Sequence, residues 1–349
     1  MYSPTYSITN KVLKYIGTVE AAREVILNAP LVPAYEKKFR EEAIVRTVHH
    51  GTHIEGNELN ISEAAQVLKG EQIVGRDRDI QEVINYRNVI NYLDYMANGE
   101  ESGGKVNEAV IKKIHALTVE KILPPESCGQ YRTSQVVVKN SVTGEITFRP
   151  PPAIEVPYQM EEFAAWIGSV GKDDMHPVLK AGVTHYELVR IHPFIDGNGR
   201  MARATATLAL FLENYDIKKF FSLEEHYDKN AGSYYEALKS ASEGELTQWL
   251  EYFTEGLAIE LTRIKEKVLR LSTDVALKEK LGGKQVFLTE RQIAMMEYIQ
   301  RVGYLTNRGF ADLFPKISED TVLRDIKDLM AKGIVKKEGK TKAARYMLR

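Results

Sequence analysis

The chain has little cysteine, little net charge and no long apolar run. One cysteine, Cys128, occurs among 349 residues, which excludes an internal disulfide and a zinc site built from several cysteines and suits a reducing cytosol. A net charge of -1 excludes polyanion binding by the surface as a whole, so a nucleic-acid surface has to be local. No apolar run reaches the roughly 18 residues of a membrane span, and the stretch after Met1 carries no secretion signal. We therefore expect a cytoplasmic protein without a membrane segment.

Helical periodicity dominates what is present, so we expect a mainly α fold. Apolar residues recur at helical spacing over residues 37–48, 62–68, 79–96, 107–123, 157–170, 176–191, 234–241 and 246–272, and a further helix starts just after residue 199. Two β-like runs, 135–138 and 145–148, flank a turn-rich stretch at 140–144. This arrangement predicts one β-hairpin within the helical part of the chain.

The last part of the chain has a different pattern. Residues 289–302, 306–314 and 318–331 have the pattern of three helices, and strand-like runs follow at 333–335 and 345–348. Three helices followed by a two-stranded wing are typical of a winged helix-turn-helix domain. The basic and polar residues expected on the third helix and the wing are Thr321, Arg324, Lys327, Lys336, Lys337, Lys340, Lys342 and Arg345.

This local positive charge suits a phosphate backbone, so residues 285–349 are a candidate DNA-binding domain. The alternative is a protein-docking or dimerising module, and a homodimer stays open. Ahead of this domain we place a helical linker at 257–284, with a boundary at Gly282-Gly283. A core at 106–256 and an N-terminal helical region at 1–105 complete the division.

The chemistry of the chain is concentrated in residues 191–203, between two helical stretches. Gly197 and Gly199 flank Asn198, so backbone N–H groups converge there, and the helix that starts at this point adds the positive end of its dipole. Arg200 and Arg203 are three residues apart and share a face near the helix start, where both guanidinium groups reach one polyphosphate. These parts predict a phosphate-binding site.

Two side chains beside this cradle supply the remaining chemistry. Asp196 is suited to hold Mg²⁺, which keeps most of its other coordination positions for water and phosphate oxygens. His192 enters from the preceding helix. With an unperturbed pKa near 6.5, about three quarters of it is neutral at pH 7, as a general base requires. A base, a metal ligand and an anion cradle predict phosphoryl or nucleotidyl transfer to an acceptor hydroxyl.

The segment from His192 to Arg203 matches the motif H-x-F-x-(D/E)-G-N-G-R-x-x-R at every specified position, so the chain resembles the Fic family. The resemblance implies a Fic-type helical bundle that transfers AMP from ATP to a hydroxyl group of a protein. It also implies that the hairpin at 134–148 is a flap that aligns the target chain by strand addition. The implied roles are His192 as the base, Asp196 as the Mg²⁺ ligand, Gly197, Asn198 and Gly199 as the phosphate cradle, Arg200 as a β-phosphate contact and Arg203 as the γ-phosphate contact.

Further details of the chain bear on this resemblance. The stretch from Gly129 to Arg132, before the hairpin, is also Fic-like. Asn230 and Tyr234 resemble the nucleotide-side segment of the family, although tyrosines at such a spacing are core residues equally often. A lysine in place of the second motif glycine marks a branch that resembles phosphate-transferring toxins. Gly199 therefore favours AMP transfer.

A second motif lies upstream, at residues 51–57. It resembles the inhibitory motif of the family, (S/T)-x-x-x-E-(G/N), whose glutamate pairs with the last arginine of the active-site motif. Glu55 bound to Arg203 would occupy the guanidinium group that orients the γ-phosphate, and a tethered carboxylate competes well with phosphate in solution. Gly51 departs from the motif, with Thr52 adjacent, and the alternative is a helix end capped by Gly56.

The sequence thus predicts an autoinhibited protein adenylyltransferase that uses ATP and Mg²⁺ and modifies Ser, Thr or Tyr hydroxyls of proteins, including its own. One alternative is a DNA-binding transcription regulator that senses nucleotide without turnover. Another is an enzyme that removes AMP from a modified target, with Glu55 positioning water. We expect no metal site at His49, His50 and His53, because no second cluster of cysteines or carboxylates accompanies them.

Overall fold

The computed structural model describes residues 2–29, 31, 33–99, 105–139, 146–171, 174–241, 244–280, 288–315, 317–339 and 344–349. The chain divides into two compact units: residues 1–27 with 40–265 make the first, and residues 28–39 with 266–349 make the second. The predicted boundaries at residues 105 and 256 lie inside the first unit, and Gly282-Gly283 lies outside the described residues. Within the described part of the chain, we find no helix with the length and apolar character that a membrane crossing requires.

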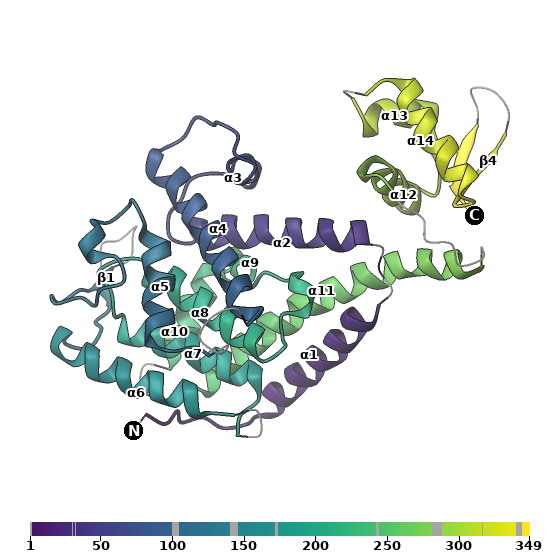
Figure 1. Cartoon of the computed structure of the whole chain (residues 1–349). Helices are drawn as coiled ribbons and strands as arrows, with labels where there is room; N and C mark the ends of the chain where they lie inside the picture. The colour runs from purple at the N-terminus through teal and green to yellow at the C-terminus, as the bar shows by residue number, and fades with distance from the viewer. Residues whose placement is uncertain are drawn as a thin grey trace. The chain divides into compact units, whose positions relative to one another are not determined.

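Helices make up nearly all of the first unit (Figure 1), which confirms the expected mainly α fold. They are α1 (Asn10–Asn28), α2 (Pro33–His53), α3 (Ile61–Leu68), α4 (Asp77–Ala97), α5 (Glu108–Val119), α6 (Val156–Ser169), α7 (Pro177–Ile191), α8 (Asn198–Leu212), α9 (Leu223–Lys229), α10 (Ala231–Ser240) and α11 (Thr247–Lys280). Helices α2 and α11, and the last residue of α1, also contribute to the second unit.

Two helices lie outside the predicted set. Helix α1 buries Val12, Val19, Ala22 and Ile26, whose spacing is helical, so the signal for α1 is present in the sequence. Helix α9 is only seven residues long and buries two glutamates in its first turn, so its pattern does not look amphipathic. Helix α2 extends beyond the predicted range of 37–48 in both directions.

Helix α8 is the centre of the first unit. Helices α7 and α8 pack against each other, and α4 and α5 also pack against α8. Helix α8 is buried on almost every side, and small residues such as Ala202, Ala204, Ala206 and Ala209 let its neighbours approach closely. The motif residues at the start of α8 are therefore held by a packed helical core.

The predicted hairpin is present as two short antiparallel strands, β1 (Val138–Lys139) and β2 (Ile146–Phe148), although β1 begins only at the last residue of the predicted run 135–138. Val138 pairs with Phe148, and Lys139 pairs with Ile146. Ahead of β1, Gln135 Nε2 donates to Pro150 O at 3.0 Å, which joins the entry of the hairpin to its exit. The predicted turn at 140–144 lies outside the described residues.

Besides the parts of α1, α2 and α11 that belong to it, the second unit has three helices and a small sheet among its described residues. Its elements are α12 (Glu290–Val302), β3 (Leu305–Thr306), α13 (Asn307–Leu313), α14 (Glu319–Ala331), β4 (Val335–Glu338) and β5 (Arg345–Leu348). The three strands are antiparallel in the order β3-β5-β4. The three helices and β5 lie where the sequence predicts them, whereas β4 begins at the last residue of the predicted run 333–335 and the two-residue strand β3 is an addition.

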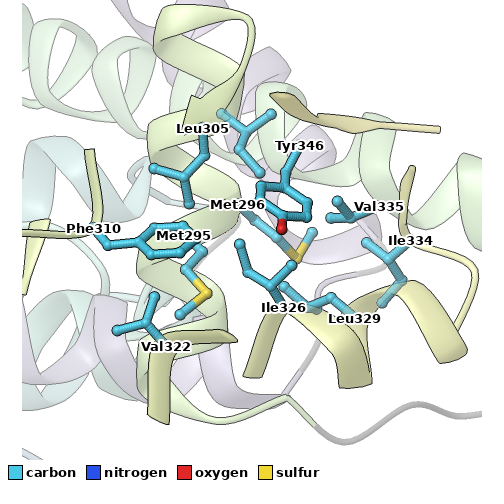
Figure 2. Packing of buried hydrophobic residues seen from close by; sticks show 11 residues of the cluster. Met295, Met296, Leu305, Phe310, Val322, Ile326, Leu329, Ile334, Val335 and Tyr346 are labelled. Atoms are coloured by element: carbon cyan, nitrogen blue, oxygen red, sulfur yellow. The ribbon is translucent and has the colours of Figure 1, made fainter. Parts of the chain in front are cut away.

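Figure 2 shows the hydrophobic core of the second unit. Met295 and Met296 of α12 belong to one buried cluster with Ile326 and Leu329 of α14 and Tyr346 of β5. Because these side chains come from helices and sheet of the same unit, the unit has a core of its own, as an independent domain does.

Candidate active site

Residues 192–197 form the turn between α7 and α8. His192 ends α7 in the left-handed region, with φ 50°, and Gly197 precedes α8 with φ 76°. A Cβ atom on Gly197 would lie 2.7 Å from Val119 Cγ1 at the end of α5. Glycine therefore suits both the backbone conformation and the space at this position.

Asn198 closes the turn with two hydrogen bonds. Its Oδ1 accepts from the N–H of Phe194, and its Nδ2 donates to Phe194 O, both at 2.9 Å. The first turn of a helix leaves its N–H groups without intrahelical partners, and in α8 these groups belong to Asn198, Gly199 and Arg200. The start of α8 is therefore suited to bind an anion.

His192 lies beside this helix start with its side chain half-buried. Its Nδ1 is 3.3 Å from Val189 O, and a ring nitrogen meets a carbonyl oxygen by donating, so Nε2 is left as an acceptor. Burial lowers the pKa of His192 below its usual value, which keeps the imidazole neutral at pH 7. A neutral ring with a free Nε2 suits a general base.

His115 of α5 supports the turn through both of its ring nitrogens. Its Nδ1 accepts from the N–H of Gly129 at 2.9 Å, so its Nε2 donates to Asp196 O at 3.0 Å. Its ring stacks on Phe194 with the ring centroids 3.7 Å apart. Burial lowers the pKa of His115 to about 4, so the neutral ring keeps this pattern of donor and acceptor.

Arg132 supports the same turn from the segment before the hairpin. Its Nε donates to His192 O at 2.8 Å, and its Nη2 donates to Pro151 O at 2.6 Å. The Fic-like stretch from Gly129 to Arg132 thus contacts the motif directly through Arg132, and through His115 at its Gly129 end.

Arg200 and Arg203 are both buried, with 2% of their surface exposed. Arg200 Nη1 lies 3.1 Å from Glu82 Oε1. Nevertheless, Arg200 Nε and Nη1 and Arg203 Nε form no hydrogen bond within the described residues. A buried donor without an acceptor costs free energy and is uncommon in folded proteins. An anion at the start of α8 would satisfy these donors, so the residues present fit a polyphosphate.

Asp196 is the residue predicted to hold Mg²⁺. Its Oδ1 accepts from the N–H of Gly197 at 2.6 Å and lies 3.8 Å from Arg200 Nη2. Among the described residues, no three side chains of His, Cys, Asp or Glu come together to hold a metal ion. Mg²⁺ in nucleotide sites commonly uses one or two carboxylates with phosphate oxygens and water. Asp196 therefore fits the ion together with a nucleotide.

Glu55 follows the end of α2 and reaches the motif. Its Oε1 accepts from Arg203 Nη1 at 2.8 Å, and Arg203 Nη2 donates to Gly51 O at 2.8 Å. Burial acts to raise the pKa of the Glu55 carboxyl, but Arg203 and Arg200 outweigh burial and lower the pKa. The carboxylate is therefore ionised at neutral pH, and the contact joins residues 148 positions apart in the chain.

Gly51 lacks the side chain that the inhibitory motif has at this position. A Cβ atom there would lie 2.4 Å from Tyr86 Cε1. The hydroxyl of Tyr86 donates to Glu224 Oε1 at 3.0 Å, which fixes the ring in this place. Thr52 bonds within α2, with its Oγ1 2.9 Å from Val48 O. The departure at Gly51 therefore reflects the close packing of Tyr86 against α2.

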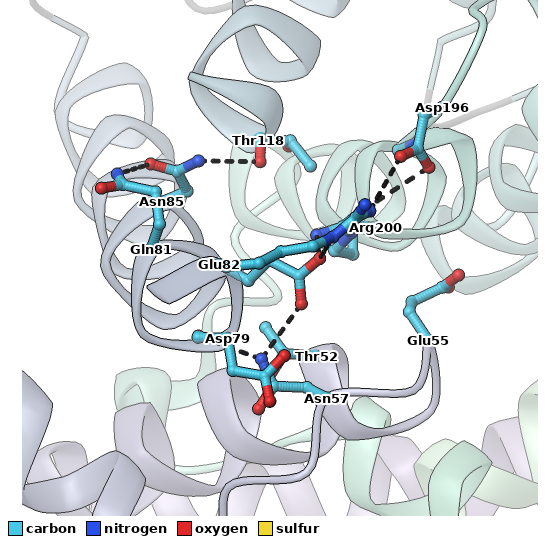
Figure 3. Close-up of polar contacts among 12 residues, drawn as sticks. Thr52, Glu55, Asn57, Asp79, Gln81, Glu82, Asn85, Thr118, Asp196 and Arg200 are labelled. Atoms are coloured by element: carbon cyan, nitrogen blue, oxygen red, sulfur yellow. Dashed lines mark hydrogen bonds and ion pairs between the residues drawn. The ribbon is translucent and has the colours of Figure 1, made fainter. Parts of the chain in front are cut away.

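Gly56 caps α2 while Glu55 contacts Arg203, so a capped helix end is compatible with the predicted inhibitory contact. Gly56 has φ 95°, and its N–H donates to His53 O at 2.9 Å. Asn57 then donates from Nδ2 to Asp79 O and to Glu82 Oε2, each at 3.0 Å (Figure 3). Helix α4 thus anchors the turn that carries Glu55.

Gly199 leaves room for the carboxylate of Glu55. A Cβ atom at position 199 would lie 2.3 Å from Glu55 Oε1 and 3.1 Å from Arg203 Nη1. A side chain at this position would therefore conflict with the contact between Glu55 and Arg203. The second glycine of the motif serves this contact as well as the predicted phosphate cradle.

Asn230 and Tyr234 differ in their surroundings. Tyr234 is buried, with its hydroxyl 2.9 Å from His185 Nε2. Burial raises the pKa of Tyr234, and the charge of nearby Arg203 acts in the opposite direction. Asn230 is exposed between α9 and α10, and its side chain caps neither helix end. A nucleotide contact by either residue stays a prediction.

Two of the three neighbouring histidines contact one carboxylate. His50 Nδ1 lies 2.7 Å from Asp228 Oδ2, and His53 Nδ1 lies 2.8 Å from Asp228 Oδ1. These contacts join α2 to α9 just ahead of Glu55. In the part of the chain that the structure describes, the histidines belong to no group that could hold a metal ion.

Two residues of α4 belong to the site without any signal in the sequence. Arg78 Nη2 lies 3.1 Å from Asp196 Oδ2, and Glu82 lies between Asn57 and Arg200, as Figure 3 shows. Both residues occupy polar positions of an amphipathic helix, as many residues with no role do. Only the packing of α4 against α8 brings them to the motif.

Comparison with known proteins identifies relatives of this chain. A family model described as Fic/DOC family matches residues 105–210. A protein adenylyltransferase Fic from Nematostella vectensis is 25% identical over 247 residues, which cover 68% of this chain and 52% of the relative. A protein of the same name from Aedes aegypti is 28% identical over 221 residues, which cover 63% of this chain and 41% of the relative. The chain thus spans about half the length of these curated relatives.

Solved structures share the fold. A Fic family protein from Desulfovibrio desulfuricans G20 has a TM-score of 0.67 at 23% identity, and the match covers 100% of this chain and 98% of that chain. A fragment of Fic-1 from C. elegans has a TM-score of 0.62 at 22% identity, and the match covers 75% of this chain and 73% of that chain. At these identities, the likeness establishes the fold alone.

Proposed function

The protein contains a Fic domain at residues 105–210, and from this premise we propose that it is an autoinhibited protein adenylyltransferase. It transfers AMP from ATP to a hydroxyl group of a protein, and Glu55 holds it inactive by default. The names of the relatives support AMP transfer. The observation that carries the inhibition is the 2.8 Å hydrogen bond between Arg203 Nη1 and Glu55 Oε1.

His192 is the base of the proposed reaction. Its Nε2 takes the proton of the acceptor hydroxyl while the hydroxyl oxygen attacks the α-phosphorus of ATP. The bond from that phosphorus to the bridging oxygen breaks, and pyrophosphate leaves. The N–H groups at the start of α8 and the guanidinium group of Arg200 bind the phosphates. Mg²⁺ held by Asp196 and phosphate oxygens would neutralise part of the phosphate charge.

Glu55 and the γ-phosphate compete for Arg203. The Arg203 side chain is buried, so the guanidinium group has little space for two anions. We call the state in which Glu55 has left Arg203 the open state, and the state with the contact formed the closed state. Keeping the open state near one per cent requires a free-energy difference of about 2.7 kcal/mol in favour of the closed state. A hydrogen bond between charged groups contributes about 1.5–3 kcal/mol. The contact between Glu55 and Arg203 is therefore of the size that the proposed inhibition needs.

The test is incubation of the chain and its variants with Mg²⁺ and ATP labelled in the α-phosphate. Glu55→Gly should label itself well above wild type, because Arg203 is then free for the γ-phosphate. Glu58→Gly is the matched control, since Glu58 lies in the same turn but is exposed and pairs with Arg76. It should label at the wild-type level.

Two outcomes of this experiment, and one outcome of a separate measurement of AMP release, would contradict the proposal. Equal labelling by wild type and Glu55→Gly would remove the inhibitory role of Glu55. Labelling that persists when His192→Ala is added to Glu55→Gly would remove the proposed base. Release of AMP from a modified protein by wild type but not by Glu55→Gly would favour AMP removal as the reaction.

For the second unit we propose DNA binding as a winged helix-turn-helix, with α14 as the recognition helix. Arg324 and Lys327 of α14 are exposed, as are Lys336 and Lys337 of the neighbouring strand β4. The two other lysines of the predicted wing, Lys340 and Lys342, lie outside the described residues. Retention on duplex DNA should weaken with salt. Arg324→Ala should reduce the slope of the logarithm of the binding constant against the logarithm of the salt concentration by about one. No retention at low salt would contradict the proposal.

A further inference from the structure

Arg78 stands in the first turn of α4 and reaches the turn that carries Asp196. Its Nη2 lies 3.1 Å from Asp196 Oδ2, and its Nε donates to Glu82 Oε1 at 3.2 Å. Arg78 and Asp196 are 118 positions apart in the chain. A cationic side chain thus rests on the carboxylate that is expected to hold Mg²⁺, and the proposed transfer gives it no role.

The two oxygens of the Asp196 carboxylate have different partners. The backbone N–H of Gly197 donates to Oδ1 at 2.6 Å, and Arg200 Nη2 is 3.8 Å from the same oxygen. The partner of Oδ2 is Arg78. The Asp196 side chain is 41% exposed, and its Oδ1 is engaged by the backbone. A divalent cation would therefore approach Oδ2, where Arg78 lies.

Arg78 and Arg200 flank this carboxylate but differ in burial. The Arg78 side chain is 60% exposed, whereas the Arg200 side chain is 3% exposed. Ion pairs between exposed side chains contribute little, because water and salt screen them and long side chains lose freedom. Arg78 is therefore easily displaced from Asp196, while packing holds Arg200 in place. Glu82 can keep the displaced Arg78 nearby, because Glu82 Oε1 accepts a hydrogen bond from Arg78 Nε.

We propose that Arg78 occupies the cation position of Asp196 when no nucleotide is bound, and that a divalent cation has to displace it. Arg78 thereby raises the concentration of divalent cation that the site requires. The inference rests on the proposed function, since it takes Asp196 as a metal ligand. The exchange replaces one cation by another at Oδ2, and it breaks only the hydrogen bond from Arg78.

The test is ADP binding measured by calorimetry over a series of Mn²⁺ concentrations. ADP lacks the γ-phosphate for which Glu55 competes, so the chain is used with its inhibitory contact intact. Arg78→Ala should lower the half-saturating Mn²⁺ concentration by about two- to fivefold, the range that an exposed ion pair accounts for. Electron paramagnetic resonance of bound Mn²⁺ in the same samples gives a second readout.

Arg87→Ala is the matched control. It removes an arginine from the same helix, but Arg87 Nη2 contacts Asn88 and not the motif. The half-saturating Mn²⁺ concentration should therefore stay at the wild-type value. A drop equal to that of Arg78→Ala would assign the effect to net charge on α4 and would overturn the inference.

Asp196→Asn separates this inference from the proposed function. Loss of the Mn²⁺ dependence in Asp196→Asn, together with the lowered requirement in Arg78→Ala, supports the inference. The same loss with an unchanged or raised requirement in Arg78→Ala overturns the inference and leaves the proposed function standing. An unchanged Mn²⁺ dependence in Asp196→Asn removes Asp196 as the ligand and overturns both.

Discussion

The substitution Gly51→Ala tests the inhibitory contact without a change to Glu55. The inhibitory motif has a side chain at this position, so the motif alone predicts no loss of inhibition when position 51 gains one. The structure predicts the reverse, because a Cβ atom there would lie 2.4 Å from Tyr86 Cε1. The carbonyl of Gly51 also accepts a hydrogen bond from Arg203. A backbone shift at this residue therefore disturbs Arg203 directly. It also displaces Glu55, which lies four residues further along the chain.

The size of the effect follows from packing. Overpacking of a well-packed site costs about 1–3 kcal/mol, and an ordinary Gly→Ala change within a helix stabilises by about 0.5–1 kcal/mol. A displacement of the end of α2 relieves this strain, and it destabilises the contact between Glu55 and Arg203 by about the same 1–3 kcal/mol. From an open fraction of about one per cent, each 1.4 kcal/mol raises this fraction about tenfold. We therefore expect labelling by Gly51→Ala to rise by about five- to fiftyfold, with saturation near the upper end.

The assay is transfer of label from ATP, measured together with the unfolding temperature. Gly17→Ala is the control, because a Cβ atom at this position of α1 has nothing within 4 Å. It should stabilise the protein slightly and leave labelling unchanged. Labelling of folded Gly51→Ala at the wild-type level would refute the reasoning. Adding Gly51→Ala to Glu55→Gly should not raise labelling further, since the inhibitory carboxylate is already absent.

Two further predictions concern histidines. Burial lowers the pKa of His192, and the base has to be unprotonated, so the acidic limb of kcat/KM in Glu55→Gly should be centred below pH 6.5. An acidic limb centred above pH 6.5 would contradict this. The pKa of His115 is about 4 in the fold against 6.5 in the unfolded chain, so its contribution to stability is present above pH 6.5 and is lost as the pH falls toward 4. Between pH 7 and pH 5 this lowers the free energy of unfolding by about 2 kcal/mol. In urea unfolding, the free energy of His115→Gln should therefore fall by about 2 kcal/mol less than that of wild type over this pH range. Equal decreases in the two proteins would contradict the role assigned to His115.

The sequence by itself determined the chemical groups of the site that lie close along the chain. His192, Asp196 and Arg200 fall within one turn and the start of one helix, so their proximity follows from connectivity. The hydrophobic periodicity on both sides of the turn placed it between helices α7 and α8. Glu55 could also be identified from the sequence, because it belongs to a short motif of its own.

The tertiary structure alone decided what surrounds these groups. His115, Glu82 and Arg78 belong to helices whose sequence pattern is that of any amphipathic helix, and they reach the motif because α4 and α5 pack against α8. Periodicity indicates which face of a helix is buried, but it carries no information about the helix that covers this face.

Gly51 makes the same distinction at a single residue. In the sequence, Gly51 is a departure from the inhibitory motif, with no reason for it. In the structure, Tyr86 of α4 occupies the space that a side chain at position 51 would need. Local spacing decides which groups one turn can present, whereas contacts between distant segments depend on how whole helices fit together, and that fit exists only in the folded chain.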